Sequence, residues 1–132
     1  MSSIVHPEGW PRPRGYANGV KARGETVFVA GQVGWNTRGE MVAADMAGQV
    51  RQALENVCAV LAAAGAEAEH VVRMTWYVTD LDAYRAQQSE IGEAYRAVMG
   101  AHYPAMTLVQ VAGLVEEGAK VEIEATAVVP EA

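Results

Sequence analysis

The sequence has a single cysteine, no long hydrophobic run and few basic residues for its 132 positions. One cysteine cannot form a disulfide within the chain, and Cys58 lies in an apolar helical pattern, where a small buried thiol is generally inert. No segment reaches the roughly 18 apolar residues that a membrane span needs, and no apolar signal segment opens the chain. We therefore expect a cytoplasmic protein without a membrane partner.

The chain is acidic, with 16 acidic residues, 10 basic residues and a formal net charge of −6. The basic residues are scattered singly, so no basic stripe is present to neutralise phosphates, and we expect no nucleic-acid partner. Glycine-rich phosphate loops and metal-type residues at ligand spacing are also missing. The sequence thus implies neither a cofactor nor a metal.

The length and the 51% hydrophobic content suit one domain with an ordinary core. Residues 1–14 contain three prolines, a glycine and a tryptophan, which predict an extended arm rather than a regular element. The domain should then occupy residues 15–132.

Five stretches have the apolar or alternating pattern of β-strands. The first two are separated by Arg23-Gly24, which favours a β-hairpin. Gly31, inside the second strand, indicates a bulge or a close approach of a ligand, and a plain packing requirement would explain it equally well. The predicted strands cover residues 16–22, 26–33, 71–79, 106–111 and 120–128.

Two helices separate these strands. Asp45 is the predicted N-cap of a helix that reaches about residue 64, with Gly65 at C′, and a second helix over residues 83–99 ends at Gly100. The order ββ-α-β-α-ββ predicts an α+β fold with both helices on one face of the sheet. Because the strands hold more apolar residues than one face requires, we expect self-association to cover the other face.

Four motifs lie in the order typical of a known family: VFVAGQV at 27–33, RQALENVCAVLAAAGA at 51–66, VVRMTWYVTDLDAY at 71–84 and the segment 102–128. Through them the chain resembles the RidA/YjgF family of imine and enamine deaminases, from about residue 15 to residue 129. The resemblance implies a chorismate-mutase-like α/β sandwich with a mixed sheet. It also implies a homotrimer with a small-molecule cleft between each pair of subunits.

The resemblance also assigns roles to individual residues. It implies that Glu122, the first glutamate of V-E-I-E, orients the water that attacks the C=N carbon, and that Tyr16 orients the substrate or donates a proton. Without it, Glu122 would be interpreted as part of a solvated strand face and Tyr16 as a packing residue. Further ligand-binding positions are implied at Ala30, Gly31, Gln32, Gln88 and Thr107.

The chain departs from the family at Met106, which replaces the arginine of P-A-R-[ST] that grips the substrate carboxylate. A charge-assisted bond of this kind contributes roughly 1.5–3 kcal/mol, so its loss should weaken binding of imino acids by about tenfold to a hundredfold. Met106 instead offers a flexible apolar wall, which favours a larger, more apolar or aromatic ligand. Arg14 would supply a replacement cation if the arm folds over the cleft.

Two functions follow from these residues. The first is a hydrolase that releases ammonia from a small imine or enamine other than the usual imino acids. The alternative is a trimeric binding protein that holds an apolar or aromatic metabolite without turnover.

Overall fold

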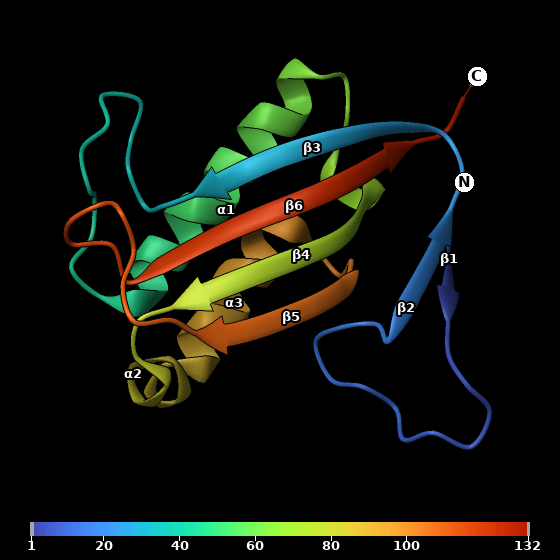
Figure 1. The fold of residues 1–132 in the computed structure, drawn as a ribbon, viewed down its shortest axis with the longest axis horizontal. Coiled ribbons are helices and arrows are strands. Elements are labelled where there is room, and N and C mark those ends of the chain that lie inside the picture. The colour runs from blue at the N-terminus through green and yellow to red at the C-terminus, as the bar shows by residue number, and fades with distance from the viewer. Residues whose placement is uncertain (1, 132) are drawn as a thin grey trace.

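The sheet is organised around β6 (Val121–Val129), whose residues alternate between apolar and polar. The computed structural model describes residues 2–131 and places β6 between β3 (Glu25–Gln32) and β4 (Val71–Val78), antiparallel to both. At the far edge, β5 (Ala105–Gln110) runs parallel to β4, which gives the order β3-β6-β4-β5 (Figure 1). The predicted α+β class and mixed sheet are confirmed.

The helices cover one face of this sheet, as the sequence predicts (Figure 1). They are α1 (Met46–Ala63), the short α2 (Leu81–Ala86) and α3 (Gln88–Met99), and a 3-10 turn, η1 (Ala68–His70), precedes β4. The shared core is closed by side chains with no exposed surface, among them Val50, Leu54, Val57, Leu61, Met74, Val78, Val121 and Ile123. None of the helices within residues 2–131 combines the length and the apolarity needed to cross a membrane.

Gln87 divides the helix predicted over residues 83–99 into α2 and α3. Its backbone leaves helical geometry (φ −115°, ψ 23°), and its side chain reaches the start of α1. There Gln87 Oε1 accepts a hydrogen bond from Ala47 N (3.0 Å) and Nε2 donates to Asp45 Oδ2 (3.2 Å). Asp45 occupies the predicted N-cap position, but its side chain caps nothing. Gln87, which is remote from α1 in the sequence, thus provides the acceptor for a backbone N–H in the first turn of α1.

The predicted arm is not wholly irregular. β1 (Ser2–Val5) pairs antiparallel with β2 (Gly19–Ala22), and the two form a ribbon separate from the main sheet (Figure 1). The prediction of no regular element before residue 15 is therefore wrong for Ser2–Val5. The outermost predicted positions, 1 and 132, lie outside the described residues.

The predicted hairpin between β2 and β3 is also wrong, because β3 pairs with β6 and β2 pairs with β1. At Gly24 the backbone takes φ +150° and passes so close to Val129 that an added Cβ would lie 2.1 Å from its carbonyl oxygen. The ribbon is held at the opposite edge of the sheet, where Ala17 N donates to Pro104 O (2.9 Å) and Ala17 bridges to Ala105. The chain therefore turns away from β3 instead of folding back along it.

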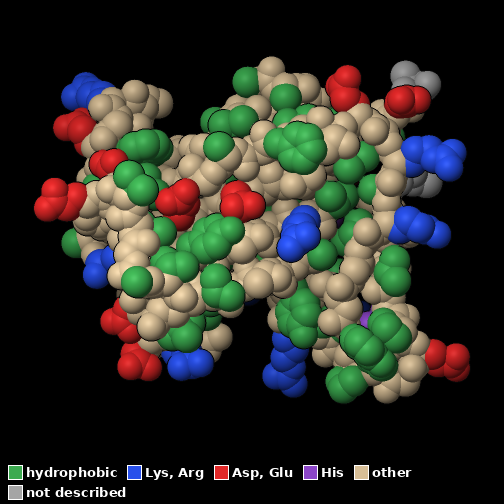
Figure 2. Space-filling view, in the orientation of Figure 1, with side chains coloured by type: hydrophobic (Ala, Val, Ile, Leu, Met, Phe, Trp, Pro, Cys, Tyr) green, Lys and Arg blue, Asp and Glu red, His purple; other side chains and the backbone are tan. Residues whose placement is uncertain are grey.

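No helix covers the second face of the sheet, which is visible in Figure 2 with carboxylates and hydrophobic side chains side by side. Phe28 on β3 is 79% exposed there, and Val109 on β5 is also exposed. Glu124 and Thr126 on β6 add polar groups. This face therefore carries exposed apolar side chains beside polar groups.

Replacing Gly24 with alanine tests the crossing at Val129. Alanine would have to adopt a positive φ and its Cβ would meet backbone, so we expect Gly24→Ala to lower the free energy of unfolding by roughly 2–3 kcal/mol in urea denaturation. The matched control is Gly39→Ala, where φ is +74° but nothing lies within 4 Å, and it should cost only about 1 kcal/mol. Equal losses for the two variants would contradict this backbone crossing.

Candidate functional site

A cavity of about 310 Å³ lies between β5, the α2–α3 region and the segment before Ala17, and we call it the β5 cavity. The Ala17 contacts to Pro104 and Ala105 hold that segment beside β5. The residues lining the cavity are Arg14, Gly15, Tyr16, Trp76, Tyr84, Ile91, Tyr95, Met106, Thr107 and Leu108. The volume is in the range of a site for one small molecule.

Aromatic rings form the inner part of the β5 cavity. Trp76 is only 3% exposed, and its ring centroid lies 6.3 Å from that of Tyr95. Tyr95 stacks on Tyr103 at 5.2 Å and donates its hydroxyl to the carbonyl of His102. Among the residues that the structure describes, Trp76 Nε1 is the one fully buried side-chain nitrogen or oxygen without a hydrogen-bond partner. An unpaired buried donor costs about 1–3 kcal/mol.

The β5 cavity contains hydrogen-bond donors and no carboxylate. Burial raises the pKa of Tyr84, against a smaller opposing effect of its hydrogen bond with the Gln88 side chain. Burial also raises the pKa of Tyr95 well above its usual range, and both phenols therefore keep their protons at neutral pH. Arg14 is the one charged residue among those lining the cavity. The site can therefore donate to acceptor atoms of a ligand.

Glu122 lies elsewhere, against the β-bulge of β3. The register of β3 and β6 shifts between Val29 and Gln32, which confirms the bulge interpretation of Gly31. A Cβ on Gly31 would lie 2.0 Å from Glu122 Oε2, so a larger residue would displace this carboxylate from its present position. Ala30 and Gln32 are the chain neighbours of Gly31, and Gln32 Nε2 donates a hydrogen bond to Ala30 O (3.2 Å). This group combines a carboxylate with exposed bulge backbone.

The neighbouring carboxylate, Glu124, has a structural partner. Tyr77 on β4 donates its hydroxyl to Glu124 Oε1 (2.9 Å), and this hydrogen bond raises the pKa of Tyr77. Glu122 accepts no such bond among the described residues, although Tyr77 is its register partner on β4. Of the two, Glu122 is the carboxylate left available for chemistry.

The predicted site residues therefore form two groups on opposite sides of the sheet. Met106 is in register with Met74, which is fully buried under the helices, whereas Glu122 is in register with Tyr77, three residues further along β4 and on the uncovered face. Arg14, Tyr16 and Thr107 line the β5 cavity with Met106, and Gln88 touches it through Tyr84. One chain alone does not bring Glu122 and Met106 into one cavity.

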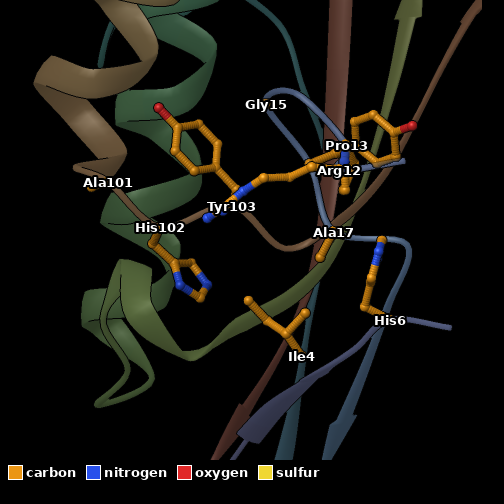
Figure 3. Close-up of a pocket in the computed structure, with 10 residues that line it drawn as sticks. Ile4, His6, Arg12, Pro13, Gly15, Ala17, Ala101, His102 and Tyr103 are labelled. Atoms are coloured by element: carbon orange, nitrogen blue, oxygen red, sulfur yellow. The ribbon is translucent and has the colours of Figure 1, made fainter. Parts of the chain in front are cut away.

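A second, larger cavity of about 700 Å³ lies between the ribbon and the connection from α3 to β5 (Figure 3). Ile4, Arg12 and Ala17 face it from the N-terminal side, and His102 and Tyr103 from the other side. Its imidazoles already have backbone partners, because Nε2 of His6 donates to Trp10 O (3.0 Å) and Nε2 of His102 donates to Val71 O (2.7 Å). Both histidines therefore have structural roles.

Neither metal binding nor thiol chemistry has a convincing site in the described part of the chain. The one group of potential ligands, Glu67, Glu69 and His70, is explained by a capping box, in which His70 Nδ1 accepts from Glu67 N (2.9 Å). Cys58 is half-buried, and burial raises the pKa of its thiol, so it stays protonated at neutral pH.

Sequence reasoning did not identify the inner residues of the β5 cavity as ligand contacts. The helical spacing of Tyr84, Ile91 and Tyr95 indicates only a helix face that packs on the sheet, and these residues also belong to the core. Trp76 is buried in the core and also lines the cavity. The sequence feature that points to this cavity is its set of aromatic residues, which the fold gathers around the edge strand β5.

Comparison with known proteins relates the chain to a described family. Residues 11–129 match the family described as Endoribonuclease L-PSP. A RutC family protein from Pyrococcus horikoshii is 35% identical over 129 residues, which cover 96% of this chain and 98% of that protein. A 2-iminobutanoate/2-iminopropanoate deaminase from Escherichia coli is 37% identical over 129 residues, with 97% and 98% coverage.

Solved structures show the same fold. The Rid family protein YyfB from Yersinia pestis has a TM-score of 0.86 at 33% identity, with 97% of this chain and 98% of that chain covered. TdcF from E. coli, whose structure contains bound serine, has a TM-score of 0.68 at 36% identity, with 96% and 98% coverage.

Proposed function

The chain belongs to the RidA/YjgF family, and from this we propose that it is an imine or enamine hydrolase that releases ammonia from a small metabolite. The observation that carries the proposal is the Glu122 carboxylate, which lies against the bulge backbone at Gly31 and has no side-chain partner among the described residues. The name of the E. coli relative, a 2-iminobutanoate/2-iminopropanoate deaminase, supports the same reaction class.

In the proposed reaction, Glu122 holds a water and accepts its proton as the oxygen attacks the C=N carbon. Tyr16 orients the substrate or donates a proton to the departing nitrogen, which leaves as ammonia while the carbon becomes a carbonyl. Imine hydrolysis needs little more than positioning and one general base, so no cofactor is required.

The two groups of site residues require a second copy of the chain. We propose a homotrimer in which the uncovered face of one subunit, with Glu122, lies against the β5 cavity of its neighbour. Exposed Phe28 and Val109 on that face support self-association, because burying large apolar side chains is favourable. Each cleft would then combine the base of one subunit with the Tyr16 and Met106 of another.

The alternative is a trimeric binding protein that holds an apolar or aromatic metabolite without turnover. Met106 favours it, since the β5 cavity lacks the carboxylate-binding arginine. Ala30 favours it as well, since the resemblance implies a serine at this position, in the family motif S-G-Q, and its hydroxyl is missing. Arg14 opposes it, because this cation lines the same cavity as Met106 and can take over part of the lost charge.

The Glu122→Gln variant separates these two functions. We expect it to lower the rate of ammonia release from 2-iminopropanoate by about 10²- to 10⁴-fold, because general-base catalysis is lost. Glu124→Gln is the matched control, since this carboxylate is two residues away and bonded to Tyr77, and it should change the rate less than about threefold. A wild-type rate equal to that of buffer would contradict hydrolysis of this substrate and leave two functions, hydrolysis of an imine without a carboxylate and ligand binding without turnover.

Sedimentation at micromolar concentration tests the trimer. We expect about three times the 14.1 kDa mass of one chain, and Phe28→Asp should shift the distribution toward monomer because it places a charge on the uncovered face. Val115→Asp changes a fully exposed loop residue and should leave the mass unchanged. A purely monomeric wild type would rule out the inter-subunit cleft.

Restoring the family arginine tests the substrate range. We expect Met106→Arg to raise the rate with 2-iminopropanoate by about tenfold or more, because a bidentate bond to the carboxylate is regained. Met106→Leu keeps the site apolar and should show no gain. A rate for Met106→Arg no higher than that of wild type would indicate that Arg14 or another group already binds the carboxylate.

A further inference from the structure

The wall of the β5 cavity contains a buried hydrogen-bond donor without a partner. Trp76 is 3% exposed, its ring lines the cavity, and its Nε1 has no acceptor among the described residues. Buried indole N–H groups normally have a partner, so this one calls for an explanation beyond packing. The neighbouring Tyr95 cannot supply an acceptor readily, because its hydroxyl is committed to the carbonyl of His102.

We propose that Trp76 determines the specificity of this cleft: its Nε1 donates a hydrogen bond to an uncharged, planar acceptor group on the substrate, such as a carboxamide or an aryl carbonyl. The inference rests on the proposed function only in identifying the ligand as an imine. The acceptor-bearing part of the ligand occupies the β5 cavity, while the imine carbon lies at the mouth, toward Tyr16.

The shape of the cavity favours a planar group. Trp76, Tyr84 and Tyr95 contribute three rings, and the Trp76 and Tyr95 planes are inclined by 33° at a centroid distance of 6.3 Å. A volume of about 310 Å³ suits one ring with a small substituent. Aromatic walls bind flat groups through offset or tilted ring contacts.

The charges of the lining favour an uncharged acceptor. A carboxylate beside Trp76 would lose its hydration with no buried cation to compensate, because the single cation of the lining, Arg14, is exposed. The lining also contains no Asp or Glu, so it offers no carboxylate to bind a cationic ligand. A neutral oxygen matches the Trp76 donor without this desolvation penalty.

Met106 fits the same interpretation. It shares the helix-covered side of β5 with Leu108, and Leu108 is the register partner of Trp76. The unbranched methionine can change rotamer and admit a ligand to the buried Nε1, whereas an arginine there would place a charge next to the indole. Met106 in place of the family arginine, together with the unpaired Trp76 donor in the same cavity wall, favours recognition of a neutral group over a carboxylate.

The test uses three probes of similar shape: benzamide, benzoate and toluene. The indole N–H signals of 15N-labelled wild type arise from Trp10, Trp35 and Trp76, and Trp76→Phe assigns the last. We expect benzamide to shift the Trp76 indole signal and to bind at least about tenfold more tightly than benzoate. Toluene should enter the cavity without producing the downfield shift of a hydrogen-bonded N–H.

Trp76→Phe should weaken benzamide about three- to tenfold, the effect of one lost hydrogen bond, and leave toluene within about twofold. Trp35→Phe is the matched control, because Trp35 does not line the cavity, and it should change neither affinity. If Trp76→Phe fails to fold, Trp10→Phe and Trp35→Phe assign the other two signals, and the wild-type spectra still decide. An unmoved Trp76 signal, or benzoate binding as tightly as benzamide, overturns the proposal.

These results are separable from the proposed function. If the benzamide pattern is found but no imine is hydrolysed, the hydrolase proposal fails and the cavity assignment stands. If Glu122-dependent hydrolysis of 2-iminopropanoate is found while benzamide leaves the Trp76 signal unmoved, the hydrolase stands and the role of Trp76 is wrong.

Discussion

The register of β6 between β3 and β4 is the constraint on which the rest of the structure depends. Val121, Ile123 and Ala127 have no exposed surface beneath the helices, and each fully buried Val or Ile side chain contributes about 1.5–3 kcal/mol. A slip of one residue would turn this apolar set to the uncovered face and bury Glu122 and Glu124 instead. The hydrophobic core therefore fixes the place of the proposed catalytic carboxylate.

The bulge of β3 completes that arrangement. A side chain at position 31 would displace the Glu122 carboxylate from its present position, and Gly31 beside the register shift leaves room for it. Tyr77 binds Glu124 and leaves Glu122 without a competing donor from that hydroxyl. Glu122 and Glu124 lie on the same strand, but the side chains around them differ, so Glu124 is held in a hydrogen bond and Glu122 is left for the proposed chemistry.

The β5 cavity depends on different contacts. Ala17 binds the strand edge at Pro104 and Ala105, which places Arg14 and Tyr16 over Met106. The same anchoring keeps the ribbon away from β3 and leaves that edge of the sheet without a strand partner among the described residues. Since Glu122 and the cavity lie on opposite sides of the sheet, catalysis as proposed is a property of the assembly rather than of the single chain.

The sequence by itself determined the strands of the main sheet, the α1 helix and the family, because alternation, helical spacing and motif order are local patterns. It could not determine which strand β2 pairs with, since that depends on the Gly24 crossing over Val129 and the Ala17 anchor. Nor could it show that Gln87 interrupts a helix to cap α1. The separation of Glu122 from Met106 and the unpaired Trp76 donor likewise required tertiary structure, because both follow from contacts between residues far apart in the chain.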